Sequence, residues 1–101
     1  MNLVQLLLPV KGNSGSSYGP EVLPAICRAL AERFGGVTAY SRSPAKGLWH
    51  DGGHVERDDV IEIEVMTESI DRAWWAAFRE QLERDLRQKE IVVRCHVIER
   101  L

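Results

Sequence analysis

The stretch that decides the fold is VIEIEV, residues 60–65, in which apolar and acidic side chains alternate. Successive residues of a strand point to opposite faces. The two isoleucines and Val65 therefore predict a buried face, and Glu62 and Glu64 predict a polar one. We expect a β-sheet that buries one face in a core and leaves the other face partly polar.

Two segments have the period of an amphipathic helix. The first begins between Pro20 and Pro24, because proline is tolerated only in the first turn of a helix, and ends at the Gly35-Gly36 pair. The second is predicted over residues 70–88, with Ser69 as its N-cap. Each has one apolar stripe with a residue at every fourth position: Val22, Ile26, Leu30 and Phe34 in the first, and Trp74, Phe78, Leu82 and Leu86 in the second.

Three further segments predict strands. Residues 3–10 (LVQLLLPV) are an apolar run typical of a central strand, and residues 37–40 (VTAY) open a second strand. The last strand is expected over residues 90–99, with one face formed by Ile91, Val93, Cys95 and Val97. The order is strand, helix, strand, strand, helix, strand, without a linker or an internal repeat. We expect a single domain over residues 1–101.

The composition limits the partners. The chain has 101 residues, with 13 Lys and Arg against 15 Asp and Glu, and a net charge of −2. This balance gives no electrostatic reason to bind nucleic acid or an anionic membrane. The apolar runs are far shorter than the roughly 20 residues that span a bilayer, and we expect no signal peptide. Cys27 and Cys95 have no CxxC spacing and are expected to be buried, reduced thiols of a cytoplasmic protein.

The element order resembles that of the ferredoxin-like superfold, an α+β architecture written βαββαβ. The resemblance implies a four-stranded antiparallel sheet in the order 4-1-3-2, with both helices on one face. The superfold carries many unrelated functions. RNA recognition is excluded, because the central strands would present Glu62 and Glu64 where bases stack on aromatic rings. Acylphosphatase-like and heavy-metal carrier functions are excluded too, since no arginine precedes Arg28 and the loop after the first strand has no CxxC pair.

Among the small oligomeric modules of this superfold, the chain is similar to PII-like signalling proteins and to dimeric α/β barrel proteins. The likeness to PII-like proteins lies in the long segment between the second and third strands, here residues 41–57. In those proteins the segment is a mobile loop that reports ligand state to a partner. The resemblance implies a homo-oligomer, a dimer in preference to a trimer, that binds a small ligand or a protein partner.

The segment with the most closely spaced candidate ligand side chains is WHDGGHVE, residues 49–56. If the turn has three residues, His50 lies opposite His54, and both share a face with Glu56. Nitrogen and oxygen donors so arranged suit a divalent metal ion. If the turn is Gly52-Gly53 alone, Asp51 opposes His54 and this metal site is lost. The other interpretations are a solvated hairpin tip and a partner-contacting loop with Trp49 as its apolar anchor.

The sheet face away from the helices is the second candidate site. Opposite charges flank its central strand, and apolar residues (Leu7, Val92 and Ile98) favour a second subunit as the cover. From one side of the sheet to the other, the expected polar neighbours are Arg94 and His96, then Gln5, then Glu62 and Glu64.

Residues 11–20 (KGNSGSSYGP) precede a helix and form either an anion-binding loop around Lys11 or a flexible connection. The sequence as a whole favours a homo-oligomeric binding or interaction module, regulatory in character, with the 41–57 hairpin as its functional projection. No resident cofactor is expected, unless the hairpin holds a divalent metal ion. The alternative is a metal-assisted or cofactor-independent enzyme with a pocket between sheet and helices, using His50, His54, Glu56 or His96.

Overall fold

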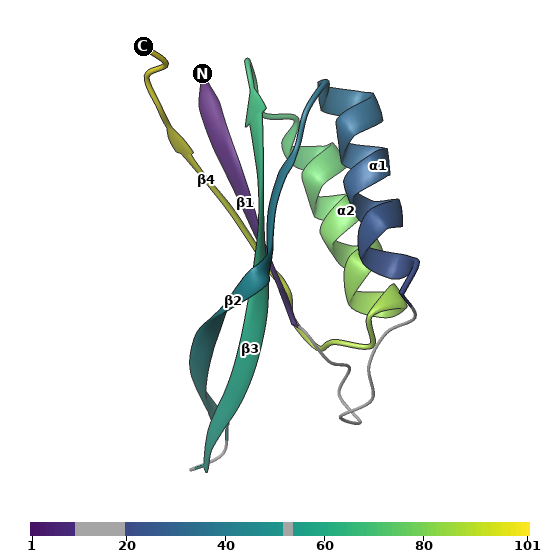
Figure 1. Cartoon of the computed structure of the whole chain (residues 1–101), viewed down its shortest axis with the longest axis vertical. Helices are drawn as coiled ribbons and strands as arrows, with labels where there is room; N and C mark the ends of the chain where they lie inside the picture. Colours follow the sequence, from purple (N-terminus) through teal and green to yellow (C-terminus); the bar gives the residue numbers. More distant parts are fainter. Residues whose placement is uncertain (10–19, 52–53) are drawn as a thin grey trace.

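The computed structural model describes residues 1–9, 20–51 and 54–101, and it describes the backbone alone for 41–47, 49–51 and 54–59. The elements are β1 (Asn2–Pro9), α1 (Val22–Phe34), β2 (Thr38–Asp51), β3 (His54–Thr67), α2 (Arg72–Asp85) and β4 (Val92–Val97). The strands form one antiparallel sheet in the order β2-β3-β1-β4. Both helices lie on the same face of this sheet (Figure 1). The predicted ferredoxin-like fold is confirmed.

The core lies between the sheet and the helices. β1 contributes Val4, Leu6 and Leu8, and β3 contributes Ile63 and Val65, all of which are buried. This is the face that the alternation in residues 60–65 predicts. The helices close the core with Leu30, Trp75, Leu82 and Leu86.

Four aromatic rings pack where α1 and α2 meet. Phe34 stacks on Trp75 with ring centroids 5.0 Å apart, and Trp74 stacks on Phe78 at 4.9 Å. Edge-to-face contacts join the two pairs, among them Trp74 with Trp75 at 4.8 Å. Such aromatic pairs stabilise a core beyond the area they bury. Both tryptophans of α2 are therefore part of the packing, as the helical period predicts.

The helix ends follow local chemistry, with one correction. α1 ends at Gly35, whose φ of 86° is left-handed and whose N–H donates to the carbonyl of Ala31. α2 begins later than predicted, because Asp71 and not Ser69 is its N-cap. The Asp71 carboxylate accepts the Trp74 N–H at 3.1 Å. Neither described helix is long and apolar enough to cross a membrane.

The second and third strands are much longer than the predicted ones. Residues 41–51 and 54–57 of the polar segment form the far ends of β2 and β3, each of 14 residues. A shift of register between Tyr40 and Ala45 lets β2 continue through this segment, as a β-bulge does. Among the described residues, β1 pairs only with Val60–Thr67 of β3, so the rest of the hairpin extends beyond the sheet (Figure 1).

The last strand is less buried than predicted. Ile91 is buried and Val93 half-buried, but Cys95 and Val97 are exposed, with 79% of the Val97 surface accessible. The reason is that β4 is an edge strand whose carboxyl end runs away from the helices (Figure 1). The prediction of two buried thiols is therefore wrong for Cys95 and holds only in part for Cys27, which is half-buried.

Candidate functional site

The open face of the sheet is the face away from the helices, and it has the predicted order of charges. We define it by the side chains of Leu3, Gln5, Leu7, Tyr40, Glu62, Glu64, Met66, Val92, Arg94 and His96. Gln5 of β1 pairs with Glu64 on one side and with Arg94 on the other. Glu62 lies two residues before Glu64 on the same face of β3, opposite Leu7. The register therefore places acidic groups on one side of β1 and basic groups on the other.

Gln5 links the two sides. Its Nε2 donates to Glu62 Oε1 at 2.7 Å, and its Oε1 accepts from Arg94 Nε at 3.0 Å. One neutral amide therefore satisfies a carboxylate and a guanidinium that lie on neighbours of the central strand. Bonds to charged groups are stronger than neutral ones. The chain of three side chains holds Arg94 and Glu62 in defined positions on the open face.

Tyr40 adds a second polar link on the acidic side. Its hydroxyl donates to Glu64 Oε2 at 3.4 Å. The negative charge of Glu64 raises the pKa of Tyr40, and desolvation, the charge of Glu62 and the hydrogen bond raise it further. The carboxylates favour the protonated phenol because a phenolate would repel them.

The apolar part of the open face is larger than the sequence analysis identified. Leu3 and Met66 form a cross-strand pair, and His96 lies on the other side of Leu3. Met66 is 47% exposed and Tyr40 is 48% exposed. Sequence reasoning missed Leu3, Tyr40 and Met66 for this face, although extending the period of two along each strand would have found them.

The described strands of the hairpin have the register in which Asp51, and not His50, opposes His54. Asp51 pairs with His54, His50 pairs with Val55, and Trp49 pairs with Glu56. The two histidines are therefore not cross-strand partners, and the arrangement from which the metal site was argued is absent from this register. The side chains of these residues lie outside those that the structure describes, so their roles in metal or partner binding stay predictions.

The remaining sequence candidates are separate from the open face. The proposed anion loop, residues 11–20, falls outside the described residues except at Pro20. Among the side chains that the structure describes, no three His, Cys, Asp or Glu gather to hold a metal ion. A cavity of about 190 Å³ opens between α2 and β4, on the helix side of the sheet. The described lining includes none of the residues named for the enzymatic alternative.

Comparisons with known proteins agree on the architecture. No protein-family model matches the chain, and no curated protein sequence does. Among solved structures, a phage SAM lyase in complex with S-methyl-5'-thioadenosine is similar with a TM-score of 0.61 and 14% identity, over 94% of this chain and 79% of the lyase. The PII-like protein CutA from Nostoc sp. PCC 7120 is similar with a TM-score of 0.57 and 16% identity, over 98% of this chain and 82% of CutA. The resemblance to PII-like proteins is confirmed as a likeness of fold, and function has to be argued from this chain's own residues.

Proposed function

We propose that the chain is a homodimeric binding module in which a second copy covers the open face and the β2–β3 hairpin contacts the module's partner. The observation that carries the proposal is the sidedness of charge on the open face. Arg94 and His96 lie on β4, and Glu62 and Glu64 lie on β3, with β1 between them. A face with opposite charges on its two sides can complement a second copy of itself.

The charges on the open face favour one of two symmetric orientations of the two copies. A twofold axis that lies between the faces and parallel to β1 places β4 of one copy over β3 of the other. Arg94 of each copy then faces Glu64 of the other, because both pair with Gln5 in the sheet. An axis perpendicular to β1 would instead place β4 over β4 and β3 over β3, and like charges would repel. The charges therefore favour the parallel axis.

The apolar residues of the open face supply the favourable free energy of dimerisation. Leu3, Leu7 and Val92 are half-buried in the single copy, and Met66 is exposed. A chain of 101 residues buries a smaller fraction of its surface than a larger domain does, so a second subunit adds stability. Two sheets packed face to face interdigitate these side chains. Removal of apolar surface from water is the main favourable term in such an association.

The β2–β3 hairpin is the part of the module that we propose contacts its partner. Among the described pairings, His54–Asp59 of β3 pairs with β2 alone, and Leu48 of β2 is 65% exposed. An isolated two-stranded ribbon is marginally stable in water. A ribbon of this kind gains stability when a partner packs against it. We propose that Trp49, His50, His54 and Glu56 belong to this contact.

Charge reversal tests the dimer. Sedimentation velocity at micromolar concentration should show a dimer for the wild type. Arg94→Glu or Glu64→Arg should raise the dimer dissociation constant by about tenfold or more, which corresponds to 1.4 kcal/mol. The double variant should recover most of that loss, because the reversed charges again face each other across the twofold axis. Arg28→Glu, on the exposed surface of α1, is the matched control and should leave the dimer unchanged.

Three results would contradict the proposed dimer. A monomeric wild type removes the second copy from the open face. A double variant that is no better than its single variants removes the pairing of Arg94 with Glu64. A trimer would contradict the twofold arrangement and leave the hairpin contact as a separate question.

The hairpin is tested with metal and with substitutions. We expect Zn²⁺ or Ni²⁺ to leave the melting temperature of the wild type unchanged, since the register separates His50 from His54. A rise that His50→Ala and His54→Ala both abolish would establish a metal site instead. Trp49→Ala should reduce partner binding without changing the dimer, which separates the two parts of the proposal.

A further inference from the structure

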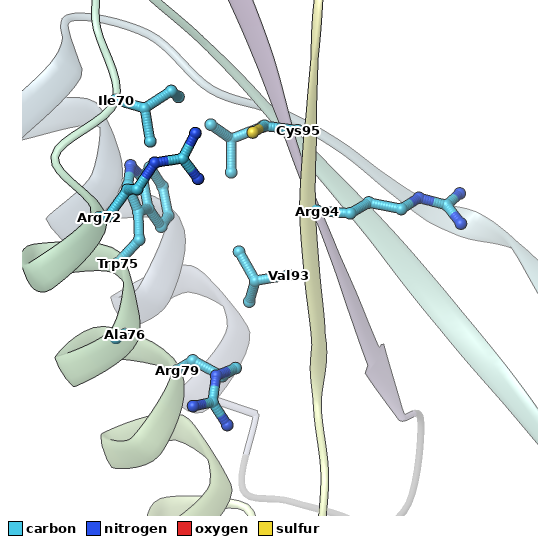
Figure 2. Close-up of a pocket in the computed structure, with 9 residues that line it drawn as sticks. Ile70, Arg72, Trp75, Ala76, Arg79, Val93, Arg94 and Cys95 are labelled. Atoms are coloured by element: carbon cyan, nitrogen blue, oxygen red, sulfur yellow. The ribbon is translucent and has the colours of Figure 1, made fainter.

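The cavity between α2 and β4 lies on the side of the sheet that the helices cover, away from the proposed subunit interface. Its lining is mainly apolar, with Val4 and Val93 from the sheet, Ile70 before α2, and Trp75 and Ala76 from α2 (Figure 2). A cavity of about 190 Å³ is smaller than the pockets that hold drug-sized ligands. It equals the volume of roughly six water molecules in the liquid. Any ligand is therefore small.

One wall of the cavity is a rigid aromatic ring. Trp75 is only 6% exposed, because it stacks on Phe34 and makes edge contacts with Trp74 and Phe78. These contacts fix the indole before any ligand arrives. A preformed wall reduces the entropy that binding would otherwise cost. The wall favours a ligand with an apolar or flat body.

Two arginines lie at the ends of the cavity, and their charges are not equivalent. Arg79 donates to both carboxylate oxygens of Glu83, at 3.0 and 3.1 Å, so its charge is balanced. Arg72 lies in the first turn of α2 and has neither an ion pair nor a hydrogen bond to the described residues. Figure 2 shows its guanidinium reaching toward β4 near Cys95, whereas the side chain of Arg94 points away from the cavity. Within the part of the chain that the structure describes, the cavity therefore presents one unpaired cation, Arg72.

We propose that this cavity binds a small carboxylate with an apolar or aromatic body. The body lies against Trp75 and Val93, and the carboxylate pairs with Arg72. The guanidinium has the planar donor geometry that suits a carboxylate. Because Glu83 already neutralises Arg79, a ligand with a single negative charge is enough to neutralise Arg72. The proposal is independent of the dimer, since the cavity and the open face lie on opposite sides of the sheet.

Benzoate is the probe, and nuclear magnetic resonance with Cys95 alkylation is the measurement. Benzoate should shift the amide signals of Ala76, Val93 and Cys95 with saturation, at a dissociation constant on the order of 1 mM for a ligand of this size. It should also slow alkylation of the exposed Cys95 by iodoacetamide. Burial raises the pKa of the Cys27 thiol, which makes Cys27 the slower-reacting internal reference.

Matched probes and variants separate charge from shape. Benzamide, which has the same shape without the charge, should bind at least about fivefold more weakly than benzoate, and inorganic phosphate should not bind measurably. Arg72→Gln should weaken benzoate to the same extent, whereas Arg84→Gln, on the exposed surface of α2, should leave it unchanged. Ala76→Leu keeps a good helix former and fills the cavity, so it should abolish binding.

The proposal is overturned by any of three results. One is the lack of saturable benzoate binding up to about 20 mM, well above the expected dissociation constant. The others are equal binding of benzoate and benzamide, and an Arg72→Gln variant that binds as the wild type does. None of these results bears on whether the chain forms a dimer.

Discussion

Glu83 joins α2 to the start of β4, and its replacement should be the most costly single change on the surface of α2. The carboxylate accepts the Ile91 N–H at 2.8 Å and binds Arg79, while the Glu83 side chain is 14% exposed. Ile91 itself is 2% exposed. Glu83→Ala therefore leaves a backbone N–H without its acceptor at the edge of the core.

The magnitude follows from these contacts. An unsatisfied N–H costs about 1–3 kcal/mol. The ion pair adds only about 0.2–1 kcal/mol, because 36% of the Arg79 side chain is exposed and solvent screens the charge. The better helix propensity of alanine returns a few tenths of a kcal/mol. We expect Glu83→Ala to lower the free energy of unfolding by about 2 kcal/mol, or the melting temperature by roughly 10 °C.

Urea unfolding followed by tryptophan fluorescence measures this loss. All variants are compared at one protein concentration, because association would change the apparent stability. Glu83→Gln keeps an oxygen for Ile91 and should cost about 1 kcal/mol or less. Glu80→Ala, at an exposed position of α2, should stay within about 0.5 kcal/mol of the wild type. Equal losses for Glu83→Ala and Glu80→Ala, or for Glu83→Ala and Glu83→Gln, would refute the role of the Ile91 hydrogen bond.

Three further predictions concern single residues. Gly35→Ala should lower the free energy of unfolding by about 1–2 kcal/mol, measured by calorimetry, because φ is +86° there. Gly36 has open space around it and no positive φ, so Gly36→Ala should not lower the free energy of unfolding. Thr67→Val should raise the melting temperature, because the buried hydroxyl has no hydrogen-bond partner among the described residues; a lower value contradicts this. In a Tyr18→Phe background, ultraviolet titration should place the Tyr40 pKa above the ordinary value for a phenol, and Glu64→Gln should lower it. Because the folded state holds this proton more tightly than the unfolded state, the contribution of Tyr40 to stability decreases as the pH rises through its unfolded pKa toward its folded one.

Local patterns were sufficient to predict the elements and their order. The alternation of residues 60–65 predicted which face of β3 enters the core, and Ile63 and Val65 are buried as expected. The Gly35-Gly36 pair predicted the end of α1. The charge order across the open face followed from the predicted strand order, because the fold fixes which strands are neighbours. These features depend on backbone periods that a short stretch of sequence contains in full.

The tertiary structure decided whatever depends on distant partners. Two registers were open for the hairpin from the sequence, and strand pairing selected the one that sets Asp51 opposite His54. Cys95 has the same alternation as Ile91 and Val93, yet it is exposed, because burial on an edge strand depends on where the helices end. Arg72 and Cys95 are 23 positions apart and meet at one cavity only after α2 packs beside β4. The sequence alone determined the periods of the elements, whereas register, coverage and the cavity required long-range packing, since these are properties of pairs of elements and not of any one segment.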